Sequence, residues 1–127
     1  MSERQNTNAK VEKYGQYDLE ERTLKFAKAV IVFVRKLPKD FVNNEIIKQL
    51  VRSSGSVGAN YIEANEALSR KDFLMHIKIS RKEAKESRYW LNLIEINDEM
   101  TEKERQVLFD EATQLMKIFG SIVEKAK

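Results

Sequence analysis

Basic side chains gather on one stretch of the chain, between residues 70 and 88. This stretch holds seven basic and three acidic residues, whereas residues 98–127 hold five basic and seven acidic ones. Six of these cations fall on one side of a helix, because positions three, four and seven apart share a face. A line of cations about 26 Å long suits contact with several backbone phosphates of RNA or DNA. The six are Lys71, Lys78, Arg81, Lys82, Lys85 and Arg88.

The basic line has a simpler interpretation, which is an ordinary solvated helix face. Tyr89 and Trp90 follow it directly and would stack on a nucleic-acid base if exposed, although packing inside the protein is the competing role. The formal net charge of the whole chain is only +3. What favours a nucleic-acid partner is therefore the concentration of positive charge on one element.

A second polar line runs along the preceding helical segment, on the face away from its apolar stripe. Its side chains are mostly short hydrogen-bonding groups, and none is a lysine. Such a line can form pairs that fix the register between helices or subunits, whereas the alternative is a plain solvated face. We predict a structural rather than catalytic role for Gln49, Arg52, Ser56, Asn60 and Glu63.

Residue types argue against catalysis and metal binding. The chain has no cysteine, which excludes a disulfide framework, a thiolate metal site and a cysteine nucleophile. A di-metal site in a helix bundle needs two Glu-x-x-His pairs, but the lone His76 has Phe73 three residues before it. No G-x-S-x-G elbow presents a serine. We predict a protein that is not an enzyme, uses no cofactor, metal or small-molecule substrate, and has His76 partly exposed.

The elements that must position these lines are helices. Gly (4) and Pro (1) are scarce, which disfavours the many turns of a β-sandwich or barrel. Breaks near Pro38, Leu68 and Asn97 divide the chain into four segments with apolar residues three and four apart. The pattern predicts an all-α, antiparallel up-down-up-down four-helix bundle over residues 18–127. Residues 1–17 are polar and aperiodic, which predicts a disordered N-terminal arm.

Helix-start chemistry precedes each segment. Asp18 with Glu21, Ser69 with Asp72 and Thr101 with Glu104 each place a capping side chain before an acidic partner, and the second helix begins around residues 41–45. Apolar stripes then follow each start. The second stripe ends at Asn65 and Leu68, and the fourth includes Phe119 and Ile122.

Small residues interrupt the second helix between positions 53 and 59. Gly55 and Gly58 together cost roughly 1–2 kcal/mol in helix propensity, and close approach of a neighbouring helix is the simplest compensation. A phosphate-binding loop would require the G-x-x-x-x-G-K-[ST] pattern after a strand. The GXXG loop of a KH domain would require a sheet.

Residues 29–34 form a run of six apolar side chains that wraps around the first helix. A bundle covers only one side of each helix, so part of this run would face water in a monomer. Ile79, Trp90 and Leu93 add apolar surface beside the third stripe. We predict a homo-oligomer. The run is far shorter than the roughly 20 residues of a membrane span, and the polar N-terminus favours a cytoplasmic protein with no membrane partner.

Residues 52–64, RSSGSVGANYIEA, carry a family resemblance together with Phe73, Arg81 and Glu86. They resemble the four-helix-bundle proteins of bacterial 23S rRNA intervening sequences, over roughly residues 17–126. The family pattern matches at Arg52, Ser53, Ser54, Asn60 and Glu63, and departs at Gly58 and Lys82, where many members have Pro and Gly.

The resemblance implies an antiparallel bundle that assembles as a ring, often a homopentamer, with no established enzymatic activity. It also implies a relationship to the accessory variability proteins of diversity-generating retroelements, which are basic pentameric bundles that bind nucleic acid. We therefore expect a ring-forming bundle whose partners are further copies of itself and RNA or DNA. The alternative is a protein–protein interaction scaffold whose basic face only confers solubility.

Overall fold

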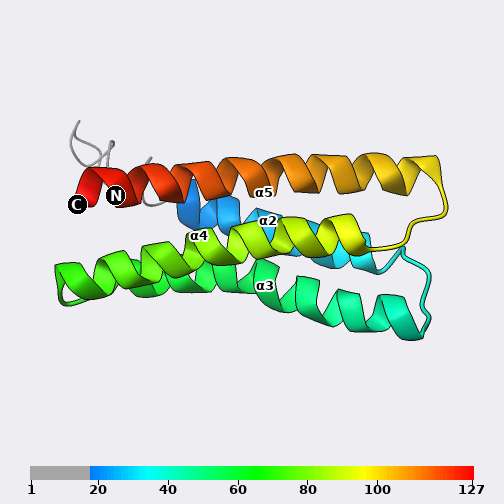
Figure 1. Cartoon of the computed structure of the whole chain (residues 1–127), viewed down its shortest axis with the longest axis horizontal. Helices are drawn as coiled ribbons and strands as arrows, with labels where there is room; N and C mark the ends of the chain where they lie inside the picture. Colours follow the sequence, from blue (N-terminus) through cyan, green and yellow to red (C-terminus); the bar gives the residue numbers. More distant parts are fainter. Residues whose placement is uncertain (1–17) are drawn as a thin grey trace, which may run out of the picture.

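Four helices make up the fold, which the computed structural model describes over residues 18–127. They are α2 (Asp18–Val34), α3 (Phe41–Asn65), α4 (Arg70–Leu93) and α5 (Glu99–Ala126). Successive helices run in opposite directions, and the longest, α5, extends along the whole bundle (Figure 1). This arrangement confirms the predicted antiparallel four-helix bundle. The arm predicted at residues 1–17 lies outside the described residues.

The core is formed by one apolar side of each helix. Phe33 and Phe119 are the largest fully buried side chains. The stripes mostly follow the predicted spacing, with differences that include exposed Ile31 in α2 and buried Ile46 in place of Ile47 in α3. Leu68 is 99% exposed because α3 ends at Asn65 and leaves it in a turn, and Val123 rather than Ile122 is fully buried near the end of α5.

A side-chain oxygen caps the start of each of α3, α4 and α5. Asp40 accepts from the backbone N–H of Asn43 at 2.8 Å, and Ser69 accepts from that of Asp72 at 3.0 Å, as predicted for Ser69. The prediction for the last helix was wrong, because α5 is capped by Asp98 rather than Thr101. Asp98 accepts from both the backbone N–H and the hydroxyl of Thr101, at 2.8 and 2.9 Å. Aspartate is a better N-cap residue than threonine, so α5 begins after Asp98 and Thr101 lies inside its first turn.

The small residues of α3 allow close packing on two sides. A Cβ atom on Gly58 would lie 2.7 Å from Oγ1 of Thr23 in α2, whereas one on Gly55 would meet nothing within 4 Å. Toward α4, the hydroxyls of Ser53 and Ser87 are 2.8 Å apart. The close-packing prediction is therefore confirmed for Gly58 and wrong for Gly55.

The helix contacts are unequal. Of the four main helix pairs, α3 and α4 share the most extensive contact, α4 and α5 the next, and α2 and α5 the least. Helix α4 is thus flanked by α3 on one side and α5 on the other, and its polar residues divide between two seams. Over residues 18–127 no helix is long and apolar enough to cross a membrane.

Candidate nucleic-acid interface

Four cations of α4 line one surface hollow of about 590 Å³, together with Met116 of α5. They are Lys78, Arg81, Lys82 and Lys85. None of the four forms an ion pair or hydrogen bond within the described part of the chain. Like charges gathered in this way raise the local positive potential, because none of the residues that line the hollow is a carboxylate.

Arg81 is the best-positioned cation of the hollow. Its aliphatic stem packs on α5, where a Cβ atom on Gly120 would lie 3.7 Å from Cδ of Arg81. Two other half-buried arginines have carboxylate partners: Arg22 pairs with Glu111 at 2.7 Å, and Arg105 with Glu102. Arg81 lacks such a partner within residues 18–127, so its guanidinium donors remain available to an external anion.

Arg88 does not contribute to the hollow, contrary to the sequence prediction. Its guanidinium lies 4.7 Å from the ring centroid of Phe109, and Nη1 lies 3.4 Å from Sδ of Met116. The Nε atom is buried without a hydrogen-bond partner. We predicted an ordinary solvated face as the alternative for this line of cations, but Arg88 and Arg81 both pack against α5. At about 100° per residue, Arg81 and Arg88 lie only about 40° and 20° from the core residue Ile77, so the helical period itself places them at the edge of the apolar stripe.

Lys71 and the two aromatic residues lie elsewhere. Lys71 is exposed in the first turn of α4 and does not line the hollow. The indole N–H of Trp90 donates to Glu86 at 2.9 Å, and Tyr89 packs edge-on against Trp90 with ring centroids 5.0 Å apart. Trp90 is thus engaged toward α3 through Glu86, whereas Tyr89 is 59% exposed; neither ring lines the hollow.

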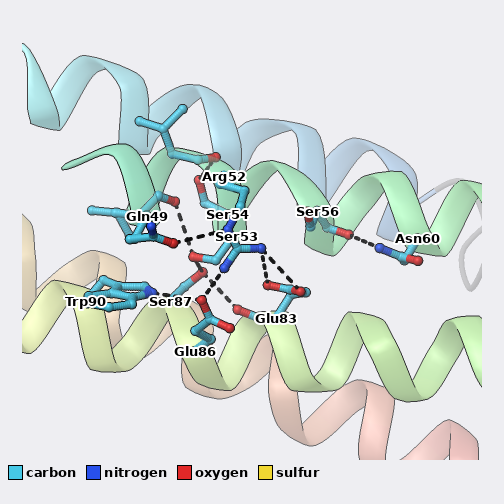
Figure 2. Close-up of polar contacts among 12 residues, drawn as sticks. Gln49, Arg52, Ser53, Ser54, Ser56, Asn60, Glu83, Glu86, Ser87 and Trp90 are labelled. Carbon is cyan, nitrogen blue, oxygen red and sulfur yellow. Dashed lines mark hydrogen bonds and ion pairs between the residues drawn. The ribbon is translucent and has the colours of Figure 1, made fainter. Parts of the chain in front are cut away.

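Arg52 is the centre of a polar network between α3 and α4 (Figure 2). Its Nη1 lies 3.3 Å from Oε1 of Glu83, its Nη2 pairs with Glu86, and its Nε donates to Gln49 at 3.3 Å. The Glu83 side chain is only 10% exposed. A carboxylate at this depth requires a cation and hydrogen-bond donors, and Arg52 supplies both.

The remaining polar residues of α3 are placed differently from one another. Asn60 donates to the carbonyl of Ser56 at 3.0 Å, and its Oδ1 lies 3.1 Å from Nδ1 of His76 in α4. Glu63 is exposed, and its carboxylate forms no ion pair or hydrogen bond with a described residue. The line was predicted to face away from the core, yet Arg52 and Asn60 reach α4, because α3 is covered on its flank as well as on its apolar stripe.

The network has the chemistry of a structural contact. Glu83 is paired with Arg52, and His76 is half-buried as predicted. No group of three or more metal-ligating side chains lies among residues 18–127. Sequence reasoning missed the roles of Glu83 and Glu86, although their spacing of three residues on one face of α4 was a usable signal.

Comparisons with known proteins agree on the fold. Residues 16–121 match the profile of a family described as 23S rRNA-intervening sequence protein. A solved structure from Bacteroides thetaiotaomicron, a protein with unknown function from the S23 ribosomal protein family, is similar with a TM-score of 0.73 and 30% identity. The similarity covers 87% of this chain and 98% of that one. A comparison with curated proteins gives no match.

Proposed function

Because the chain belongs to the 23S rRNA-intervening sequence protein family, we propose that it is a non-enzymatic bundle that forms a ring and binds RNA or DNA. The binding surface is the basic hollow of α4. The family resemblance favours five copies in the ring. A ring repeats the hollow around its axis, so weak single contacts add up to useful avidity for a polymer.

The observation that carries this proposal is the set of four unpaired cations in one hollow. Lys78 and Lys85 are seven residues apart, which is about 10 Å along the helix. Arg81 and Lys82 lie between them. This spacing suits two or more successive phosphates, and phosphate contacts of this kind tolerate any sequence. No aromatic side chain lines the hollow, so the backbone rather than a stacked base is the recognised feature.

A titration of the native oligomer with a generic RNA and a duplex DNA, at about 50 and 200 mM salt, tests the proposal. We expect binding at the lower salt and a steep loss at the higher, with about 0.7–0.9 in the slope of log K against log salt for each phosphate contacted. Replacing Arg81, Lys82 and Lys85 together with Gln should reduce both the affinity and the slope.

A control variant with the same loss of charge distinguishes the effect of the hollow on binding from the effect of the net charge. Lys28, Arg35 and Lys48 are exposed and lie outside the hollow. Changing these three to Gln removes the same charge and should leave most of the affinity. Equal losses of nucleic-acid affinity in the two triple variants would contradict a binding site confined to the hollow. No binding by the assembled native protein at low salt would favour the alternative, an interaction scaffold, which the exposed apolar side chains of α2 also support.

A further inference from the structure

Tyr89 lies near the C-terminal end of α4 and is 59% exposed. Its hydroxyl forms no hydrogen bond within residues 18–127. Exposure alone says little about function, because single apolar side chains are common on protein surfaces. The position of Tyr89 relative to the basic hollow is what gives it a role.

Tyr89 continues the row of cations that lines the hollow. It follows Lys85 by four residues and Lys82 by seven, so it lies within about 40° and 20° of them around the helix axis. Along the axis it lies about 6 Å beyond Lys85. From Lys78 to Tyr89 the row is about 16 Å long. The hollow therefore ends one helical turn before an open aromatic ring on the same face of α4.

Trp90 holds the aromatic ring of Tyr89 in place. The two rings meet edge to face, with centroids 5.0 Å apart and an interplanar angle of 76°. Trp90 packs against the core, and its indole N–H donates to Glu86, which pairs with Arg52 of α3 (Figure 2). An edge-to-face contact covers at most one face of the Tyr89 ring. The other face is thus offered to a ligand in a fixed orientation, which lowers the entropic cost of binding.

A row of cations beside an exposed aromatic ring is the combination by which proteins bind single-stranded nucleic acid. The cations follow the phosphate backbone, and the ring stacks on a base. An unpaired base can present its flat face to such a ring. In a duplex each base is already stacked between its neighbours, so this surface would reach only the phosphates.

We infer that the α4 surface binds single-stranded RNA or DNA in preference to a duplex, with phosphates in the hollow and one base stacked on Tyr89. The inference rests on the nucleic-acid binding of the proposed function and specifies the form of the ligand. The hollow itself recognises the backbone, and Tyr89 adds a base contact just outside it. Because every base has a flat face, the strand form rather than the sequence is selected.

Three ligands of equal length distinguish stacking from phosphate contacts. They are an oligothymidylate of about 20 nucleotides, its duplex with oligoadenylate, and an abasic strand that keeps the phosphates without the bases. A salt concentration of about 200 mM suits the comparison, because it weakens the phosphate contacts. The native protein should bind the thymidylate strand at least about fivefold more tightly than the abasic strand, which is the lower end of the effect of one stacked base. The duplex should also bind more weakly than the thymidylate strand.

Tyr89→Ala should remove these differences between ligands. Its affinity for the thymidylate strand should fall at least about fivefold, with no change in the salt slope, because no phosphate contact is lost. Tyr89→Phe keeps the aromatic ring and should bind as the native protein does. Phe41→Ala is the matched control, because it removes an exposed aromatic ring that does not line the hollow. Circular dichroism should show an intact fold in all three variants.

The fluorescence of Trp90 gives a second measurement, because it is the only tryptophan in the sequence. A base stacked on Tyr89 lies close to the indole and should quench its emission, whereas the abasic strand should not, even at saturation. Equal affinity of the native protein and Tyr89→Ala for the thymidylate strand would overturn this inference and leave the proposed function standing. A duplex bound as tightly as the strand would do the same. If the native protein binds none of the three ligands at low salt, the proposed function itself fails.

Discussion

A Cβ atom on Gly58 would lie 2.7 Å from Oγ1 of Thr23, closer than real Cβ contacts come. Thr23 cannot easily move away, because it is buried and its hydroxyl donates to the carbonyl of Leu19 at 2.7 Å. Helices α2 and α3 thus approach to a separation that only glycine permits at position 58.

We expect Gly58→Ala to destabilise the fold. Overpacking costs about 1–3 kcal/mol, and the gain in helix propensity offsets about 1 kcal/mol of it. Gly55→Ala is the matched control, because that position is open and only the propensity gain remains. Urea unfolding at one protein concentration should show opposite signs for the two variants. Adding Thr23→Ala to Gly58→Ala should cost less than the sum of the single changes; full additivity would contradict the close contact.

The helices were predictable from sequence because apolar spacing and capping side chains are local features. The Ser69 cap follows from two residues three positions apart, and it is correct. The contacts between helices were harder to predict. Asn43 is fully buried and joins two connections far apart in sequence, donating to the carbonyls of Pro38 and Glu95 at 3.1 and 3.0 Å. Nothing near Asn43 in the sequence signals its distant partner.

The candidate site was predicted in its residue types but not in its boundary. The spacing of the cations placed them on one side of α4 correctly. The same spacing places Arg81 and Arg88 only about 40° and 20° from the core residue Ile77, at an edge of α4 that a neighbouring helix covers. It could not show which side chains of α5 lie there, namely Phe109 against Arg88 and no carboxylate against Arg81.

The contact between Arg52 and Glu83 predicts strong coupling across the α3–α4 seam. Removing one partner of a fully buried pair costs about 3–5 kcal/mol, but Arg52 is about half exposed (47%) and solvent screens part of the interaction. We expect Arg52→Ala to lower the free energy of unfolding by about 1–3 kcal/mol. A double-mutant cycle of Arg52→Ala with Glu83→Ala measures the coupling.

The exposed pair of Lys48 and Glu45, 3.4 Å apart on α3, provides the control cycle. Its coupling should stay below about 0.5 kcal/mol. Equal coupling energies in the two cycles would mean that Arg52 and Glu83 form only a surface ion pair.

The cap at Asp98 predicts a pH dependence of stability. The backbone N–H of Thr101, and then its hydroxyl, donate to the carboxylate and hold the pKa of Asp98 below its ordinary value. The unfolded chain therefore binds this proton more readily than the folded one. The stabilisation is complete well above the ordinary aspartate pKa of about 4 and is lost as the pH falls through the lower folded value. Asp98→Asn keeps an accepting oxygen but removes the titration.

The difference in melting temperature between the native protein and Asp98→Asn should accordingly shrink as the pH falls from 7 to about 3. An NMR titration of the Asp98 carboxyl group should give a midpoint below that of a model peptide. A constant difference between the two proteins across this range would show that the cap acts through its geometry alone.

The two arginines at the α4–α5 seam predict opposite outcomes for equal changes in charge. Arg81 is in the hollow without a described partner, whereas Arg88 is held by Phe109 and Met116. Arg81→Gln should weaken RNA binding and lower the salt slope by about 0.7–0.9 for each hollow in contact, with little change in stability. Arg88→Gln should leave the salt slope unchanged and lower the free energy of unfolding by about 1 kcal/mol, because the half-buried cation–π contact is lost.

Anisotropy titrations with RNA and urea unfolding, each carried out on both variants, separate the effect on binding from the effect on stability. Equal losses of RNA affinity in the two variants would mean that Arg88 also belongs to the binding surface. Its side chain would then leave Phe109 when nucleic acid binds.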